Sequence, residues 1–377
     1  MGEQMIDSNH YIPPEIVTDI FIRLPVKTLI RCTSVCKSWY ALIRNPNFVA
    51  LHFNSNTNYR PEYRDNGYLL LGGTNFCHVV CDRTFKSLYT VETPFTVGPN
   101  RKSSLNFVGS CNGLLCLAPG LEYNLGNDVY IWNPSIRTHK KLPPSQFSDE
   151  FTDERWMVSR LGFGYHESTT DYKVIRLIYF PECRNFTSVD VAPLVEVYSL
   201  KTNSWRIIRT EVPPIVTQSV VTFYKGVFYW MGFKSIRDDP MENYIMSFDL
   251  DNEKFKEIEQ PSVDFPFSLL AVRGSSSGSL FAIYSKFFGG QNDMLVLWKM
   301  DEYNKVWTKA YTIQCNRGVW WTIGFTKTGK FLFANLEKKL VSFDLESLET
   351  QVHDLGISFS RSAVDINYME SLLLFDH

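Results

Sequence analysis

The sequence predicts a mostly β protein with a small N-terminal α module: three to four helices followed by a six-bladed β-propeller closed by N- and C-terminal strands. Three observations predict this fold class. Aromatic residues, which favour the half-buried surfaces of strands, make up 15% of the 377 residues. Apolar residues occur at helical spacing in about the first fifty positions. The remainder of the chain repeats two strand pairs at steps typical of propeller blades.

Composition and charge exclude several classes of protein. Hydrophobic residues make up 44% and charged residues 21% of the chain, which is ordinary for a globular protein. No apolar run is long enough to span a membrane, and the first ten residues lack the features of a secretory signal. The formal net charge of -2 gives no general attraction to nucleic acid or to acidic lipid. We therefore expect a cytoplasmic or nuclear protein without a nucleic-acid or membrane partner.

The cysteines favour reduced thiols over disulfides or metal ligands. Eight cysteines are thinly spread along a long chain that lacks a secretory signal. Cys77, His78 and Cys81 invite comparison with a metal site, but no second ligand pair follows at zinc-finger spacing. Packed thiols are the better interpretation of this cluster. We expect neither a metal site nor a cofactor.

Two sequence patterns suggest catalysis, but the elements predicted around them argue against a catalytic role. Residues 274–278 match the glycine–serine pattern of a nucleophile elbow, but a strand follows where the elbow needs a helix, so we predict a hairpin turn. Asp82, Asp249 and Asp344 recur like the carboxylates of a glycosidase, but they fall at turns, where Asp bonds to nearby backbone. We therefore expect no catalytic residues.

The N-terminal residues form a helical pattern that is too small to be self-sufficient. Apolar residues recur at three-to-four spacing over 16–24, where Pro25 ends the first helix, and again over 29–43 and 48–53. A module of this size buries too little surface to be robust alone, and its apolar positions outnumber what it can hide. We infer a helical module that completes its core against a partner.

A dense set of positions within 12–43 carries a resemblance to a known family. These positions are Pro13, Ile16, Ile20, Leu24, Pro25, Lys27, Leu29, Arg31, Val35, Cys36, Lys37, Trp39, Leu42 and Ile43. The string resembles the F-box of plant F-box proteins. Ile12 stands where the family usually has Leu, a swap that keeps volume and polarity. The resemblance implies docking onto a Skp-type adaptor, which bridges to a cullin in an SCF ubiquitin ligase.

The resemblance implies that ten residues of this chain contact the adaptor. They are Ile12, Pro13, Ile16, Ile20, Leu24, Pro25, Leu29, Val35, Cys36 and Trp39. The alternative is that several of them only pack the helices together. Both interpretations stay open, because the module is too small to bury all of them.

A strand–turn–strand unit recurs six times from residue 77 onward. Its turns fall at positions 82, 133, 199, 249, 299 and 344, so most steps are 45 to 51 residues. A second strand pair lies between successive copies, and two pairs make one four-stranded blade. Five blades are continuous in sequence, over 105–143, 159–210, 218–259, 268–314 and 319–356. The sixth combines 67–93 with a C-terminal strand that we expect to begin at Glu370, which leaves no exposed sheet edge.

The repeated region also carries motifs of a known domain. These are Asn112-Gly113-Leu114, Asn133-Pro134, Gly162-Phe163-Gly164-Tyr165, Asp171-Tyr172-Lys173-Val174, Trp205 and Phe248-Asp249-Leu250. They resemble the F-box-associated, kelch-like domain of plant F-box proteins. The diglycine of standard kelch repeats does not recur from repeat to repeat, and the Trp–Asp dipeptide of WD repeats is absent.

Both resemblances together imply a division of labour along the chain. We predict an F-box over 1–54, a linker over 55–66 and a substrate-recognition propeller over 67–377. The implied function is that of a non-catalytic substrate-recognition subunit of an SCF-type ubiquitin ligase, which tethers a target protein for ubiquitination and degradation. The alternative is an F-box scaffold protein that acts outside a ligase. The length and layout also resemble pollen S-locus F-box proteins, which recognise a secreted ribonuclease. The sequence therefore does not identify the target.

Loop lengths predict which face of the propeller binds the target. The connections between strand pairs and the 144–158 connection are long, whereas the turns within pairs are short, and the two kinds emerge on opposite faces. We expect the long-loop face to hold the target, with aromatic anchors at Trp156, Phe180, Phe186, Phe233 and Phe287. The F-box is expected on the short-turn face, because the chain enters the sixth blade at its second strand.

Overall fold

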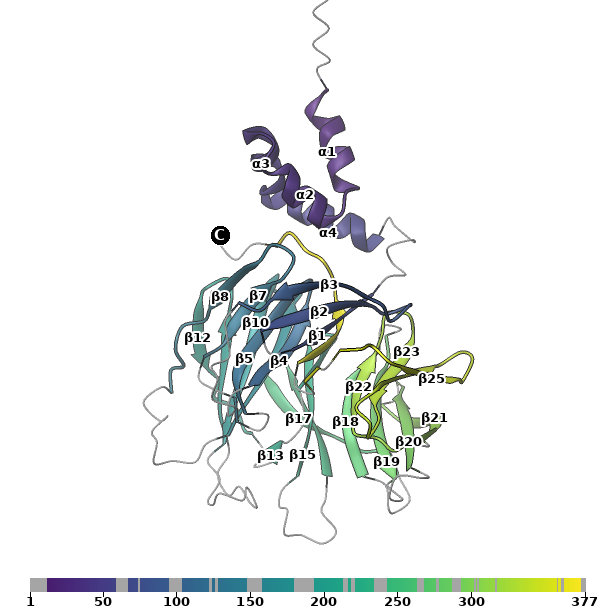
Figure 1. Cartoon of the computed structure of the whole chain (residues 1–377). Coiled ribbons are helices and arrows are strands. Elements are labelled where there is room, and N and C mark those ends of the chain that lie inside the picture. Colours follow the sequence, from purple (N-terminus) through teal and green to yellow (C-terminus); the bar gives the residue numbers. More distant parts are fainter. Residues whose placement is uncertain are drawn as a thin grey trace, which may run out of the picture.

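The computed structural model confirms an N-terminal helical module followed by a six-bladed propeller (Figure 1). It describes residues 12–58, 67–73, 75–94, 104–121, 124–125, 128–147, 158–179, 193–212, 216–217, 221–233, 243–262, 268–275, 278–286, 293–301, 303, 305–315, 317–357, 359–360 and 363–373. Among these residues, no helix is both long and apolar enough to cross a membrane.

Four helices form the N-terminal module. They are α1 (Pro14–Ile22), α2 (Val26–Cys32), α3 (Lys37–Ile43) and α4 (Pro46–Asn58). Proline begins α1 and α4 and directly precedes α2. Proline has no backbone N–H, and it is tolerated there because the N–H groups of a first helical turn have no partner within the helix. The last helix is longer than the 48–53 pattern predicts. It continues four residues past position 54, so it enters the segment that was predicted as a linker.

The strands form six antiparallel sheets within the described residues, and five of these sheets are continuous in sequence. Their strands are β4 (Ser104–Cys111), β5 (Leu114–Leu121), β6 (Asn124–Leu125), β7 (Tyr130–Asn133) and β8 (Thr138–Lys141); β9 (Val158–His166), β10 (Asp171–Tyr179), β11 (Leu194–Ser199) and β12 (Ser204–Ile207); β13 (Val216–Thr217), β14 (Thr222–Tyr224), β15 (Val227–Phe233), β16 (Asn243–Asp249) and β17 (Lys254–Ile258); β18 (Ser268–Gly274), β19 (Leu280–Lys286), β20 (Asp293–Met300) and β21 (Trp307–Cys315); and β22 (Trp321–Phe325), β23 (Lys330–Ala334), β24 (Leu340–Asp344) and β25 (Thr350–His353). Each sheet corresponds to one predicted blade.

The sixth blade joins both ends of the chain, but through a different strand from the one predicted. Its order is β26 (Val364–Tyr368), β1 (Tyr68–Gly72), β2 (Phe76–Cys81) and β3 (Ser87–Glu92). The prediction of a closing strand that begins at Glu370 is wrong. Its apolar run indicated burial correctly, but Leu372 is buried against the helices and not against the sheet.

The ring is closed through contacts between the innermost strands. Each innermost strand contacts the next one around the ring. The order is β26, β4, β9, β14, β18 and β22, and β22 contacts β26 again. These strands approach closely where they lack side chains. A Cβ atom at Gly164 of β9, for example, would lie 2.4 Å from Cγ of Phe223 of β14. The close approach explains the glycine at this position of the predicted repeat.

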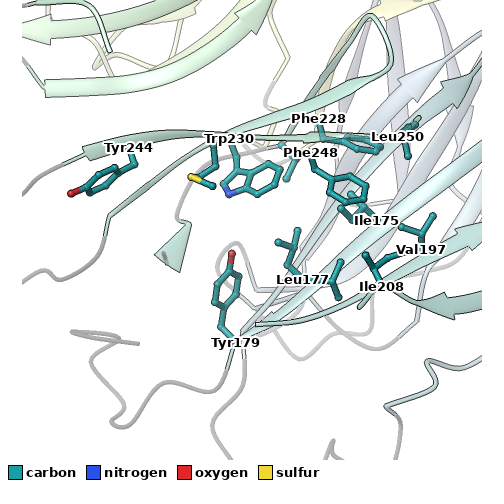
Figure 2. Packing of buried hydrophobic residues seen from close by; sticks show 13 residues of the cluster. Ile175, Leu177, Tyr179, Val197, Ile208, Phe228, Trp230, Tyr244, Phe248 and Leu250 are labelled. Atoms are coloured by element: carbon teal, nitrogen blue, oxygen red, sulfur yellow. The ribbon is translucent and has the colours of Figure 1, made fainter. Parts of the chain in front are cut away.

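Apolar side chains fill the space between neighbouring blades. Figure 2 shows one such cluster, in which Ile175 and Leu177 of β10 face Phe228 and Trp230 of β15. Both blades contribute alternate residues of their strands, as in other packed pairs of sheets. The propeller core is therefore divided into inter-blade clusters and not gathered in a single centre.

A histidine lies in the contact between the fifth and sixth blades. The His353 ring stacks on Phe85 at 3.7 Å between centroids, and its Nε2 atom lies 2.8 Å from Oγ of Ser342. Burial and then the positive charge of Lys330 lower the pKa of His353 to about 4. The neutral imidazole is therefore the form that this contact favours.

We predict that acid weakens this contact between pH 6.5 and pH 4. In that window the unfolded chain protonates His353 at its ordinary pKa of about 6.5, whereas the folded chain does not, so stability falls as the pH falls. Because the ring is only partly buried, solvent screens part of this effect, and we expect a loss of about 1–2 kcal/mol. Urea unfolding across this range measures the effect, with His353→Gln as the non-titrating control. Equal pH slopes in both proteins would contradict the assignment.

Candidate functional site

Helix α1 is apolar on two faces, and only one of them is covered. Phe21 is buried in the helical core, and Val17 packs against it. Ile16 and Ile20, four residues apart on another face, are 49% and 47% exposed, and the preceding Ile12 is 54% exposed. Isoleucine side chains of this exposure on one helix face indicate a surface that binds a partner.

The connection between α2 and α3 also carries exposed apolar side chains. Val35 is 63% exposed, and Cys36 is exposed where α3 begins. The Cys36 thiol lies 3.1 Å from Oγ of Ser38, and this hydrogen bond, together with the backbone N–H of Trp39, lowers the pKa of the thiol. Tyr40 follows on α3, with its ring under the Arg44 guanidinium.

The structure separates the ten predicted adaptor-binding residues into three groups. Six are exposed, namely Ile12, Pro13, Ile16, Ile20, Val35 and Cys36. Leu24, Pro25 and Trp39 are half-buried, and both Leu24 and Trp39 pack against the helical core. Leu29 has no exposed surface and belongs to that core, so the packing alternative holds for this residue. Its assignment as a contact residue is corrected, because α2 directs it inward.

Three further exposed residues were not among the predicted contacts. Ile30, Tyr40 and Leu51 are each more than a third exposed, on α2, α3 and α4 respectively. For Tyr40 a signal was available, since it lies four residues from Cys36 and therefore on the same side of α3. Leu51 lies within the predicted 48–53 helix but beyond the 12–43 match from which the contact residues were transferred.

The core beneath this surface is built by all four helices. Its buried residues are Phe21, Val26, Leu29, Ile43, Phe48 and Val49, with Leu372 from outside the helices. The Phe21 and Trp39 rings meet edge to face at 4.9 Å. The buried His52 of α4 makes a 2.9 Å hydrogen bond through Nε2 with the Leu24 carbonyl, beyond the end of α1. This bond holds α4 against α1, and the sequence pattern did not reveal it.

The helices contact the propeller on the side of its short turns, as predicted (Figure 1). Ile136, in the turn between β7 and β8, packs against the helical core together with Leu373. Lys27 of α2 lies over the Tyr89 ring of β3, with 5.3 Å from Nζ to the ring centroid. Apolar packing and a cation–π contact thus join the two parts of the chain.

The predicted target-binding face falls mostly outside the described residues. Among the five aromatic anchors, Trp156, Phe180, Phe186 and Phe287 lie outside them. The backbone of Phe233 pairs with Val216 and Asn243 at the end of β15. The role of these five aromatics stays a prediction.

Two of the three turn carboxylates bond to nearby backbone as we expected, whereas Asp82 is buried and its Oδ2 accepts a hydrogen bond from the distant Thr328 hydroxyl. Oδ1 of Asp249 accepts the backbone N–H of Asp251 at 2.8 Å, and Oδ1 of Asp344 accepts that of Glu346 at 3.0 Å. Cys77 is buried, which raises the pKa of its thiol to about 12. In the described part of the chain, no group of three or more His, Cys, Asp or Glu side chains is arranged to hold a metal ion.

The suspected nucleophile elbow is a hairpin turn. Ser275 donates its backbone N–H to the Ser279 carbonyl at 2.7 Å, between the antiparallel strands β18 and β19. The elbow would need a helix at the position of β19. The prediction of a hairpin is therefore confirmed.

A small helical module with an exposed apolar face, joined to a six-bladed propeller, is the architecture expected of an F-box protein. Comparison with known proteins agrees with this class. A family model described as F-box-like matches residues 10–50, and a model of the F-box associated beta propeller domain matches residues 73–372. The chain belongs to the family of F-box proteins that carry this propeller domain. Membership supports a role as substrate receptor of SCF-type ligases in general.

Curated relatives come from a plant. F-box protein CPR1 of Arabidopsis thaliana is 29% identical over 94% of this chain and 87% of its own length. An F-box/kelch-repeat protein of the same species is 27% identical over 81% of this chain and 80% of its own length. The alignment with CPR1 leaves out only 6% of this chain, so that likeness extends over both the helices and the propeller.

We predict that stability and partner binding reside on different faces of the helical module. Leu29→Ala removes a fully buried side chain and should cost about 2–5 kcal/mol of stability in the helices. Ile16→Ala truncates a half-exposed side chain and should cost less than about 1 kcal/mol. Amide hydrogen exchange in α1 to α4 measures both. Equal losses of protection would show that Ile16 is a core residue too.

Proposed function

We propose that this chain is the substrate-recognition subunit of an SCF-type ubiquitin ligase. Its helices bind a Skp-type adaptor, through which the chain reaches a cullin, and its propeller binds a protein target. The observation that supports this most is the exposed apolar row of Ile12, Ile16 and Ile20 at α1, together with the exposed Val35 between α2 and α3. These side chains stay exposed although the core beneath them is complete, so internal packing does not account for them.

The adaptor interface that we propose is centred on the exposed residues. Burial of a large aliphatic side chain contributes about 1.5–3 kcal/mol, so three isoleucines and a valine are sufficient to anchor an interface. The exposed parts of the half-buried Leu24, Pro25 and Trp39 also belong to this interface. The buried parts of Leu24 and Trp39 pack against the core of the helices that carry the exposed row. Leu29 acts only through the core.

The chain itself carries out no chemistry under this proposal. It holds the target near the ubiquitin-transferring partners and so raises their effective concentration. We propose the propeller face opposite the helices for target binding, with Trp156, Phe180, Phe186, Phe233 and Phe287 as anchors. Long loops on a rigid scaffold support that choice, since recognition residues are commonly found there.

Replacement of the exposed isoleucines tests the adaptor interface. The double variant Ile16→Ala with Ile20→Ala should weaken binding of a purified Skp-type adaptor by about 10- to 100-fold, because each side chain loses about 1 kcal/mol or more of buried contact. Leu348→Ala is the matched control, since Leu348 is also exposed but lies in the propeller. Calorimetric titration measures the affinities. Unchanged affinity in the double variant would refute the interface.

Affinity purification separates the ligase role from a scaffold role outside a ligase. The tagged wild-type chain, expressed in plant cells, should recover both the adaptor and a cullin. The double isoleucine variant should lose both together, because the cullin is reached through the adaptor. Recovery of the adaptor without a cullin would favour the scaffold alternative and contradict the ligase role.

A further inference from the structure

A short segment after the closing strand connects the propeller to the helices. Residues 369–373, here called the 369–373 segment, leave β26 on the side of the ring where the helices lie (Figure 1, yellow). The buried Asn133 of the first blade donates from Nδ2 to the carbonyls of Ser371 and Leu373, each at 3.0 Å. The Ser371 N–H donates to Oγ of Ser135 at 3.0 Å. The segment is therefore hydrogen-bonded along its backbone to one blade.

Two further contacts fix the course of this segment. Tyr89 of the sixth blade donates its hydroxyl to Oε1 of Glu370 at 2.6 Å. Gly113, in the turn between β4 and β5, lies so close that a Cβ atom there would be 2.3 Å from Cβ of Ser371. Its φ of 84° is in the left-handed region that favours glycine. The first and sixth blades thus hold the segment from several sides.

The side chains of the same segment enter the helical core. Leu372 is only 4% exposed and packs among Phe21 of α1, Leu29 of α2 and Phe48 of α4. Leu373 is partly buried and packs against both the helical core and the core between the first two blades. One segment therefore belongs to two hydrophobic cores, one between the first two blades and one formed mainly by the helices.

We propose that Leu372 is a positioning residue, which fixes the orientation of the adaptor-binding helices on the propeller. The backbone on both sides of Leu372 is hydrogen-bonded to the propeller, and its side chain lies in the core that the four helices form, so the helices cannot rotate without extraction of this side chain from their core. The consequence for ubiquitin transfer rests on the proposed function. A target held by the propeller is then presented at one fixed position relative to the adaptor, and only some of its lysines face the transfer site.

Distance measurements between the two parts of the full chain test this coupling. Spin labels are attached to Cys36 on the helices and to the new thiol of Ser347→Cys, at an exposed position of the fifth blade, in a Cys32→Ser, Cys183→Ser background. The buried thiols of Cys77 and Cys315 and the partly buried thiol of Cys111, whose pKa values are each raised to about 12, stay unlabelled. Pulsed electron spin resonance should give one narrow distance distribution for this background protein.

Leu372→Ala should widen that distribution at least two-fold, whereas Leu372→Met, which keeps the volume, should preserve it. Leu336→Ala, at an exposed propeller leucine, is the control and should change nothing. Ser135→Ala loosens the segment from the blade without a change in the helices and should also widen the distribution. An unchanged width in both Leu372→Ala and Ser135→Ala would overturn the proposal.

Adaptor binding separates positioning from folding. Leu372→Ala without spin labels should bind a purified Skp-type adaptor within about three-fold of wild type, because the exposed row of α1 is untouched. Loss of adaptor binding together with loss of helical amide protection would show that Leu372 only completes the fold of the module, which overturns a positioning role. Failure of the wild-type chain to bind adaptor would refute the proposed function, while the distance result would still decide the coupling.

Discussion

The helices of this chain are too few to bury all the apolar side chains that they carry, and the arrangement of the molecule depends on this constraint. Their inward-facing residues form a core that includes Leu372 from the far end of the described chain. The outward-facing isoleucines of α1 have no comparable cover within the described residues. One apolar surface is thus covered by the chain itself, and the other remains for a second protein.

Closure of the propeller determines where the helices attach. Tyr68, at the start of β1, pairs with Tyr368, at the end of β26, so the chain enters and leaves the ring at one place. That place lies on the side of the short turns, because β1 and β26 are the second and first strands of their blade. The same strand pair therefore closes the ring and brings Leu372 to the helices. A closing strand further along the chain would have used this leucine inside the sheet.

Local patterns in the sequence were sufficient for elements whose burial is set by their nearest neighbours. Alternating residues and turn residues predicted the five continuous blades, because each strand packs on its own hairpin partner and on the next blade. The leucines after Glu370 and the inward direction of Leu29 were not predictable in this way. An apolar run shows that a segment is buried, but not which of two distant parts buries it. The loops of the far face carry no periodic pattern, so the sequence assigns their aromatics no position.

The distribution of apolar residues in α1 and α2 also bears on how tethering works. A receptor that holds a target gains from a fixed geometry only if the partner and target sites do not move relative to each other, since each free rotation between them adds an ordering cost at transfer. Backbone hydrogen bonds of the 369–373 segment to one blade and the burial of Leu372 in the helices meet this requirement without a large interface. The exposed row of α1 then needs to provide only affinity, because orientation is already fixed on the opposite side of the same helix.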